Sequence, residues 1–330
     1  MAANLTPQYL DAEEEYKKAQ TPEEKLAALK TMFQLVPKHK ASEKLQADLK
    51  TKMKDLKEEI DEGKKHPKKV GVSYKFPKQG AGQYIILGGP NAGKSRLLTR
   101  LTRAAPEVAP FPFTTREPHV GMMDWQDVKV QLIDTPPITA DYLEPYVSSV
   151  VRAADAAIVM LDLGDDDGPF AVEAVLERLA QVKTILQGEK PATQEDYSIQ
   201  YVRTLLVANK IDLPGAQDRL DIVREMYAGR FPIHVISAEH GAGLEDLREG
   251  IYKFLNVIRV YTKQPGKPPD MSSPFTCPIG STVVELAAQV HRDFADQLKS
   301  ARIWGSGVHD GQAVGREHVL GDKDVIELHI

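Results

Sequence analysis

The stretch GGPNAGKS, residues 88–95, decides how this chain is interpreted. It fits the pattern G-x-x-x-x-G-K-[ST], follows the apolar run YIIL and precedes the helical pattern SRLLTRL. Backbone N–H groups of such a turn, and of the helix N-terminus after it, face bound phosphates. The stretch therefore predicts a nucleotide phosphate loop. Its expected nucleotide-binding residues are Gly88, Pro90, Asn91, Ala92, Gly93, Lys94 and Ser95.

Length and composition favour a multidomain globular protein. The chain has 330 residues, 42% hydrophobic and 27% charged, with a net charge of −5. It lacks the overall basic charge of many dedicated nucleic-acid binders. Cys277 is the single cysteine, which suits a reducing compartment. Because no run approaches the ~18 apolar residues of a membrane span, we expect no membrane insertion and a cytoplasmic location.

The N-terminal part, residues 1–70, is expected to form a helical hairpin. Leu26, Leu29 and Phe33 recur at helical spacing before Pro37, and a second apolar stripe runs from Leu45 to Ile60. Lysines around this second stripe could contact RNA phosphates or form a solvated helix face. Residues 71–83 are rich in Gly, Pro and Lys and are expected to form a linker.

Residues 84–261 alternate apolar runs with helical patterns. Several of the runs are apolar on both faces, as buried parallel strands are. We expect an α/β fold, a P-loop G domain with a doubly wound, mostly parallel sheet. The expected strands are YIIL (84–87), VKVQLI (128–133), AAIVMLDL (156–163), TLLVA (204–208) and IHVI (233–236).

The C-terminal part is expected to form a separate small domain. Residues 262–270, with three prolines, form a second expected linker. In residues 271–330, Ser281 or Thr282 can cap a helix, and the final VIELHI alternates as a half-buried strand does. This pattern is typical of a β-grasp module.

Three residues are expected to handle the phosphates and Mg²⁺. Lys94 would reach the β- and γ-phosphates and stabilise charge during catalysis, and the Ser95 hydroxyl would bind Mg²⁺. Asp134, in DTPP, ends an expected strand and can hold Mg²⁺ through water. A threonine of FTT, residues 113–115, can bind Mg²⁺ and contact the γ-phosphate.

Two further segments predict the base specificity. In NKID, residues 209–212, Asp212 can accept hydrogen bonds from N1–H and the 2-amino group of guanine, a donor pair that adenine lacks. This favours GTP over ATP. A Ser-Ala pair follows the next expected strand. The expected base-site residues are Asn209, Lys210, Asp212, Ser237 and Ala238.

These segments together resemble the five G motifs of the Obg/DRG group of translation-factor-class GTPases. SPFTCPIGSTVVELAAQVHRDF and VGREHVLGDKDVIELHI resemble a TGS domain. The resemblance covers residues 80–330, and the N-terminal helices loosely. It implies GTP hydrolysis to GDP, binding to ribosomes or another RNA assembly, and Thr115 rather than Thr114 as the Mg²⁺ ligand and catalytic residue. The oligomeric state stays open.

Departures from the family pattern bear on the rate of hydrolysis. Pro137 stands where the family has a glycine whose N–H contacts the γ-phosphate, and Ile138 stands where many GTPases have a water-orienting glutamine. We therefore expect slow intrinsic hydrolysis. The glycine-rich N-terminal Obg domain is absent, and the segment between DTPP and NKID is too short for the extra subdomain typical of DRG proteins. A binding scaffold with negligible hydrolysis, or an ATPase, are the alternatives.

Asn91 is a candidate K⁺ ligand. Potassium-activated GTPases that this chain resembles carry an Asn in the loop, where K⁺ adds positive charge beside the phosphates. The alternative is that Asn91 only fits a tight turn.

Overall fold

A computed structural model describes the chain as two compact units, residues 1–72 and 73–330. The described residues are 8–9, 12, 16, 22–36, 46–54, 56–57, 76–102, 107–108, 118–191, 193 and 196–330.

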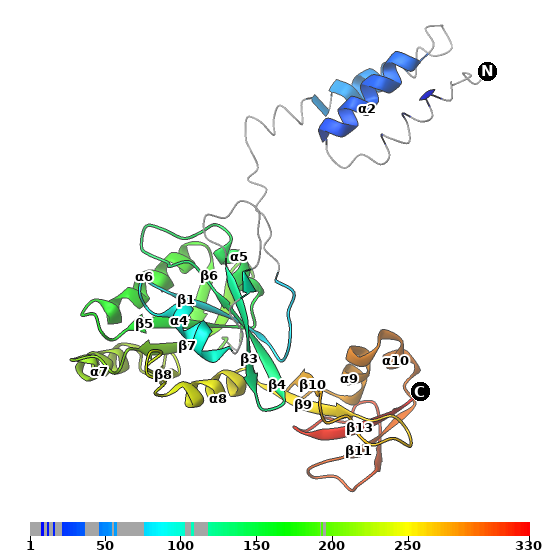
Figure 1. The fold of residues 1–330 in the computed structure, drawn as a ribbon. Coiled ribbons are helices and arrows are strands. Elements are labelled where there is room, and N and C mark those ends of the chain that lie inside the picture. Colours follow the sequence, from blue (N-terminus) through cyan, green and yellow to red (C-terminus); the bar gives the residue numbers. More distant parts are fainter. Residues whose placement is uncertain are drawn as a thin grey trace. The chain divides into compact units, whose positions relative to one another are not determined.

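The N-terminal unit contains helix α2 (Pro22–Leu35) and a second helical stretch over 46–54 (Figure 1). Leu29 and Leu49, one from each expected apolar stripe, are buried together in one small cluster. Lys50, Lys52 and Lys54 are exposed. Four further lysines considered as RNA contacts lie outside the described residues: Lys64, Lys65, Lys68 and Lys69.

The first sheet of the second unit has eight strands in the order β2-β3-β4-β1-β5-β7-β6, with β8 also paired to β7 (Figure 1). The pairs of β1 with β4 and β5, and of β7 with β5, β6 and β8, are parallel. β3 is antiparallel to β2 and β4. The bounds are β1 Gln83–Gly88, β2 Glu107–Val108, β3 His119–Trp125, β4 Val128–Asp134, β5 Ala156–Asp162, β6 Thr184–Gln187, β7 Gln200–Asn209 and β8 Ile233–Val235.

This mostly parallel α/β sheet confirms the predicted fold class, and all five expected strands form. Helices α5, α6 and α7 contribute to the hydrophobic cluster on one face, and α4 and α8 to the cluster on the other. Coverage of both faces explains why the runs YIIL of β1 and AAIVML of β5 are apolar throughout. The helix bounds are α4 Lys94–Leu101, α5 Val147–Ala153, α6 Gly168–Gln181, α7 Ala216–Tyr227 and α8 Leu244–Phe254.

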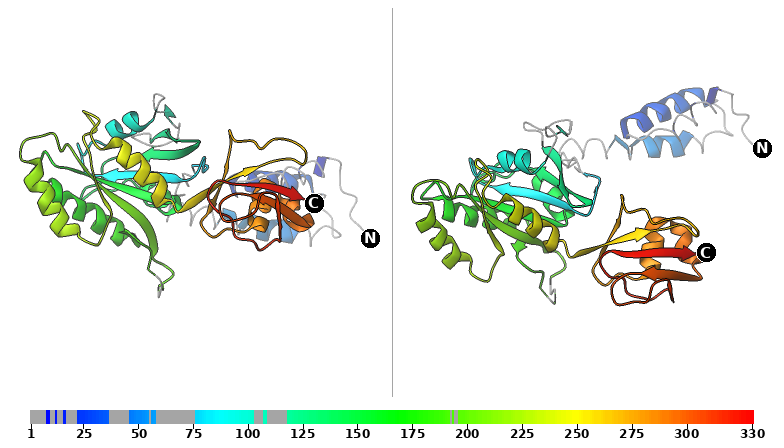
Figure 2. Two further views of the ribbon diagram at one scale, coloured as in Figure 1. Left: turned by 90° about the horizontal axis from the view of Figure 1, so that it is seen from below. Right: turned by 60° about the horizontal axis from the view of Figure 1, so that its bottom comes forward.

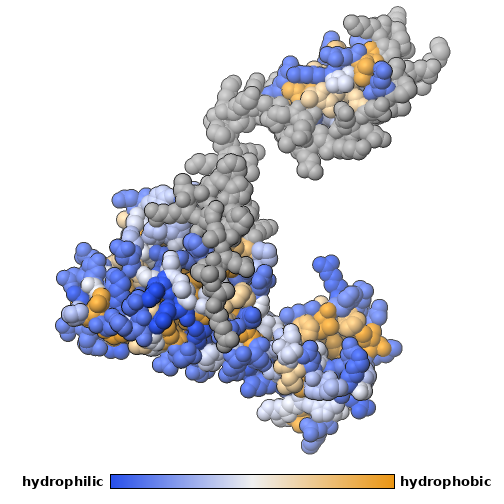
Figure 3. Space-filling model, in the orientation of Figure 1, coloured by the Kyte–Doolittle hydropathy of each residue, from blue (hydrophilic) through white to orange (hydrophobic). Residues whose placement is uncertain are grey.

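The outer surface of this sheet domain is mainly hydrophilic on the face seen in Figure 3, with scattered hydrophobic residues. Phe170 and Tyr197 are examples of exposed apolar side chains. Isolated residues of this kind are ordinary on protein surfaces.

The second sheet has five strands in the order β10-β9-β13-β11-β12. β9 runs from the end of α8 directly into this sheet (Figure 2), so the expected boundary after residue 261 falls inside β9. Helix α9 contributes buried residues to a third hydrophobic cluster, shared with this sheet, and Phe294 of α10 packs against it. The bounds are β9 Val257–Thr262, β10 Phe275–Pro278, α9 Val283–Val290, α10 Arg292–Gln297, β11 Ser300–Trp304, β12 Gln312–Val314 and β13 Asp324–His329.

Thr282, rather than Ser281, caps α9. A capping box joins Thr282 and Glu285, whose side chain accepts a hydrogen bond from the Thr282 N–H at 2.9 Å. The last expected strand forms as β13, with Ile326 fully buried.

A buried arginine joins the two sheets. Arg259 of β9 donates to Asp127 at 2.9 Å and to Gln126 at 2.6 Å, both in the turn between β3 and β4. It also donates to Asp322, at 2.7 and 3.1 Å. Tyr261, also on β9, donates its hydroxyl to Asp127. The β3–β4 turn is thus tied to the C-terminal sheet by charged hydrogen bonds.

Candidate nucleotide-binding site

The phosphate loop lies between β1 and α4 and depends on two glycines. Gly88 has φ 151° and Gly93 has φ 96°. A Cβ on Gly88 would lie 2.6 Å from the Met160 carbonyl oxygen, and one on Gly93 would lie 2.2 Å from Asn209 Nδ2. Only glycine fits at both positions, because the backbone angle and the close neighbours both exclude a side chain.

Lys94 starts α4 and is buried, with 7% of the residue exposed. Its Nζ donates to the carbonyl oxygens of Gly88 at 3.2 Å and Gly89 at 2.9 Å. Burial lowers the pKa of Lys94, and nearby Asp134 partly opposes that shift. Since the ammonium has only carbonyl partners, an anion in the loop would find a partly desolvated cation.

Asp134 ends β4 next to α4. Its Oδ2 accepts a hydrogen bond from the Ser95 hydroxyl, whereas its Oδ1 is buried without a hydrogen-bond partner. Burial raises the pKa of Asp134, against the lowering effects of the Ser95 hydrogen bond and of Lys94. A hydroxyl and a carboxylate with an unused oxygen are the hard ligands that Mg²⁺ prefers, so these residues fit the ion.

Asn209, at the carboxyl end of β7, connects two loops. Its Nδ2 donates to the Ala92 carbonyl at 2.9 Å, and its Oδ1 accepts from the Ala238 N–H at 2.9 Å. Both ends of the amide are therefore engaged by protein. Ala92 and Ala238 are themselves buried. Asn209 thus brings the phosphate loop and the Ser-Ala segment together.

The expected base-site residues lie at the same edge of the sheet. Asp212 is exposed, and His240 Nε2 lies 3.5 Å from its Oδ2. A hydrogen bond from Ser237 lowers the pKa of Asp212, which keeps its carboxylate available as an acceptor. Ser237 is fully buried, and its hydroxyl also accepts from the His240 N–H at 3.0 Å.

Lys210 has a positive φ of 67° and forms an ion pair with Asp162. Sequence reasoning missed Asp162 as a site residue, although it ends β5 next to β7. The signal was available, because the carboxyl ends of parallel strands meet at one edge. Asp162 holds the Lys210 side chain in place beside the base site.

Two other expected residues lie at the tip of the phosphate loop. Pro90 and Asn91 are exposed at the loop tip. Asn91 has φ 57°, a conformation that Asn tolerates well, so the turn explanation and the K⁺ explanation both remain compatible with its geometry. Thr115 and the rest of FTT lie outside the described residues.

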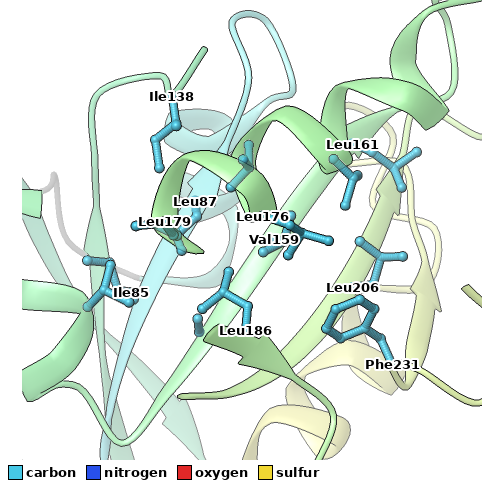
Figure 4. Packing of buried hydrophobic residues seen from close by; sticks show 14 of the residues in the cluster. Ile85, Leu87, Ile138, Val159, Leu161, Leu176, Leu179, Leu186, Leu206 and Phe231 are labelled. Carbon is cyan, nitrogen blue, oxygen red and sulfur yellow. The ribbon is translucent and has the colours of Figure 1, made fainter. Parts of the chain in front are cut away.

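The segment after Asp134 is bound to β1. Thr135 donates its hydroxyl to the Ile86 carbonyl at 2.8 Å, and the Ile138 N–H donates to the Gly88 carbonyl at 3.1 Å. The Ile138 side chain is 2% exposed and packs in the core with Ile85 and Leu87 (Figure 4). Position 138 therefore contributes packing in this arrangement rather than a polar group.

Comparison with protein-family models matches two parts of the chain. A family described as 50S ribosome-binding GTPase matches residues 83–210, and the TGS domain matches residues 258–330. The chain carries a GTPase domain followed by a TGS domain. The second match begins in β9, in agreement with the sheet to which this strand belongs.

Relatives of the chain include developmentally regulated GTP-binding proteins. A developmentally regulated GTP-binding protein of Xenopus laevis is 29% identical, over 78% of this chain and 85% of its own. A Dictyostelium discoideum homologue is 26% identical, over 92% and 98%. A GTP-binding protein of Methanocaldococcus jannaschii is 27% identical, over 93% of each chain.

Solved structures similar to this GTPase include the YchF GTPase of Schizosaccharomyces pombe. It is 13% identical, covers 78% of this chain and 100% of its own, and has a TM-score of 0.49. The G domain of the T. maritima FeoB iron transporter is 22% identical, covers 52% and 98%, and has a TM-score of 0.39. Within the part of the chain that the structure describes, no helix is both long and apolar enough to cross a membrane.

Proposed function

We propose that this GTPase hydrolyses GTP slowly and acts as a nucleotide-gated switch on ribosomes or another RNA assembly. The observation that carries the proposal is the pairing of buried Lys94, which has only carbonyl partners, with the unpartnered Asp134 Oδ1. A magnesium nucleotide would supply the phosphate that Lys94 lacks and the cation that Asp134 lacks. Both charges would then be compensated.

Mg²⁺ would neutralise charge on the β- and γ-phosphates when bound. Ser95 would hold it directly, and Asp134 through water. Thr115 is the third proposed ligand, from the family resemblance. Lys94 would stabilise the charge that develops on the transferred phosphoryl group as water attacks.

Asp212 would select guanine, supported by the hydrogen bond from Ser237 that keeps its carboxylate charged. Competition of ATP against labelled GTP tests this assignment, and preferential ATP binding would overturn it. In Asp212→Asn, one acceptor becomes a donor. The variant should lose affinity for GTP and gain affinity for xanthosine triphosphate, whose 2-oxo group can accept that donor.

Slow hydrolysis is supported by the position of Ile138. Its side chain lies in the core and its N–H is bonded to Gly88, while Pro136 and Pro137 have no N–H to offer. The same observation favours the second candidate, a GTP-dependent scaffold. Single-turnover hydrolysis with and without ribosomes separates them. A rate at the uncatalysed background under both conditions would support the scaffold.

Potassium activation is proposed from Asn91 at the exposed loop tip. Its carbonyl oxygen could hold K⁺ beside the phosphates. GTP turnover in K⁺ should exceed turnover in Na⁺ at equal ionic strength, and Asn91→Ala should remove the difference. Equal rates in the two salts for the unmodified protein would contradict the proposal.

The ribosome is the proposed partner because the matching family model is that of 50S ribosome-binding GTPases. Segments 111–123 and 134–145 would differ between the GTP and GDP states and thereby gate binding. Ribosome sedimentation with GDP or a non-hydrolysable GTP analogue tests this, with Asp212→Asn as control. Absence from the pellet in both states would reject the ribosome as partner.

A further inference from the structure

A second hollow lies in the GTPase domain, away from the nucleotide loop. Its volume is about 810 Å³, within the range of about 300–1,000 Å³ usual for ligand pockets. It is formed by β7, the end of β6 with the residues after it, β8 with the segment before it, and the last turns of α8. Its lining holds three cations, one carboxylate and three rings: Arg203, Arg230, Lys253, Glu189, Phe231, His234 and Phe254.

The hollow and the nucleotide site lie toward opposite ends of β7. Arg203 precedes Asn209 by six positions on the same strand. At ~3.3 Å per residue their Cα atoms are about 20 Å apart. A ligand could therefore occupy the hollow while a nucleotide occupies the loop.

Two arginines beside this hollow each lie over a phenylalanine ring. The Arg203 guanidinium carbon lies 4.1 Å from the centre of the Phe254 ring, and that of Arg230 lies 5.2 Å from the Phe231 ring. A guanidinium that lies over a ring still has N–H groups at its edge that can donate, and Arg230 already uses one of them for Glu173.

The two arginines differ in their ion pairs. Arg230 pairs with Glu173 at 3.0 Å. For Arg203, no carboxylate among the described residues lies within ion-pair distance. A half-buried cation that has an aromatic partner but no carboxylate partner can still bind an anion.

His234 and Gly250 shape the inner wall. A Cβ on Gly250 would lie 2.3 Å from His234 Cε1, so the glycine gives the imidazole room beside α8. Burial lowers the pKa of His234, with Asp246 opposing. The neutral ring offers one donor and one acceptor, which suits a ligand with its own polar edge.

The two guanidinium groups, together with the further positive charge of a lysine, match one class of ligand better than others. Unstacked RNA bases stack on guanidinium planes and on aromatic rings, and their phosphates bind Arg and Lys. A lone phosphate would leave most of the hollow empty. An acidic peptide would satisfy the charges but not the stacked surfaces. Lys253, whose partner Glu249 lies 2.6 Å away at the surface, adds a third cation at the rim.

We propose that this hollow binds single-stranded RNA, with one base stacked on Arg203 and the flanking phosphates held by Arg230 and Lys253. The inference deepens the proposed action on an RNA assembly and rests on it for its biological setting. It places the contact with RNA in the GTPase domain, at the end of β7 remote from the nucleotide.

Fluorescence anisotropy with a labelled 12-nucleotide oligouridylate tests the site, using the full chain saturated with GDP. Arg203→Gln should weaken binding by at least about fivefold, the usual effect of losing one stacked base. Arg203→Lys keeps the charge but lacks the plane, and should resemble Arg203→Gln. Arg302→Gln, which changes an exposed arginine of β11, should bind like the unmodified protein.

Several outcomes would overturn the proposal. One is equal RNA affinity of Arg203→Gln and the unmodified protein. Another is full binding by Arg203→Lys together with equal competition by polyglutamate, which would identify an acidic-peptide site. Competition by inorganic phosphate alone at low concentration would identify a simple anion site.

Crosslinking gives a readout at the site itself. A 4-thiouridine oligonucleotide should crosslink to peptides containing Phe231 or Phe254, and Gly250→Ala, which pushes His234 toward the hollow, should reduce the yield. Crosslinks confined to other peptides would contradict the proposal. Ribosome sedimentation of Arg203→Gln keeps the two proposals separate. GTP-gated pelleting without oligonucleotide binding at this hollow would leave the switch intact and remove only the RNA site.

Discussion

Lys94 and Arg259 are the two buried cations of the described chain, and their surroundings differ. Arg259 faces the carboxylates of Asp127 and Asp322, and these hydrogen bonds raise its pKa against the effect of burial. Lys94 has two carbonyl partners, and burial lowers its pKa. The first environment is complete without a ligand. The second gives the ammonium no carboxylate hydrogen-bond partner, and nearby Asp134 offsets its burial only in part. A buried cation of this kind indicates a binding site.

The largest expected effect comes from removing the uncompensated cation. Lys94→Ala should lower single-turnover GTP hydrolysis by about 10²–10³-fold, the usual loss when one charge-stabilising donor is removed. The melting temperature without nucleotide should not fall, because the lysine's burial is unfavourable for its charge. Lys267→Ala, at an exposed lysine, is the matched control. A large drop in melting temperature would show that Lys94 is structural, and would break the comparison.

At Arg259, whose charge is paired with carboxylates, we expect a loss of stability rather than a loss of activity. Arg259→Gln leaves Asp127 and Asp322 without their main partner, and should lower the free energy of unfolding by about 3–5 kcal/mol. Denaturant unfolding measures this loss. GTP affinity of the folded variant should stay close to that of the unmodified protein. A variant of unchanged stability would mean that the junction between the sheets contributes little.

The variant Asp134→Asn tests the same comparison through the pH dependence of the melting temperature. Because the folded-state pKa of Asp134 is raised, its charged form opposes folding, and the stability it contributes at acidic pH is lost as pH rises through that pKa. At neutral pH the asparagine variant should melt higher than the unmodified protein without nucleotide. This advantage should shrink toward about pH 4, near the ordinary pKa of aspartate. Its Mg²⁺-dependent GTP binding should weaken. An equal or lower melting temperature at neutral pH would contradict the assignment.

The smallest expected effect is that of Tyr261→Phe. Burial and the hydrogen bond to Asp127 raise the pKa of Tyr261 to about 12. The variant removes one hydrogen bond while Arg259 still holds Asp127, so the loss should be about 1 kcal/mol. Chemical denaturation of this variant beside Arg259→Gln measures both. If the free energy of unfolding fell as much as in Arg259→Gln, the tyrosine would be the main stabilising residue at the junction.

The sequence predicted the parts of the fold that have strong local patterns. The five strands expected from apolar runs all form. β1 is buried along its whole length and β5 nearly so, whereas β8 is only partly buried. β3 was missed, since His119, Gly121 and Asp124 interrupt its apolar pattern and pairing with β4 stabilises it. β6 was missed because four residues carry too little pattern. Both depend on contacts with distant segments, which sequence patterns do not reveal.

The sequence predicted which residues belong to the candidate site, but it did not predict the contacts between them. The motifs identified Asn209 and Asp134 as site residues. The contacts of Asn209 with Ala92 and Ala238 follow from the register of separate strands. β9 was not expected from the sequence. Its alternation VIRVYT puts Arg259 and Tyr261 on one face, and their partner Asp127 lies more than a hundred positions away. Only the folded chain brings these groups together.

Strand β4 connects the nucleotide site with the TGS domain and could couple the two. The strand begins one residue after Asp127, which is fixed to the TGS domain, and ends at Asp134 in the nucleotide site. Its seven residues span about 20 Å, without a flexible joint. If nucleotide exchange shifts this strand, then thermodynamic reciprocity requires the opposite influence as well. Binding of a partner to the TGS domain would then change the affinity for nucleotide. Nucleotide would change the affinity for that partner by the same factor.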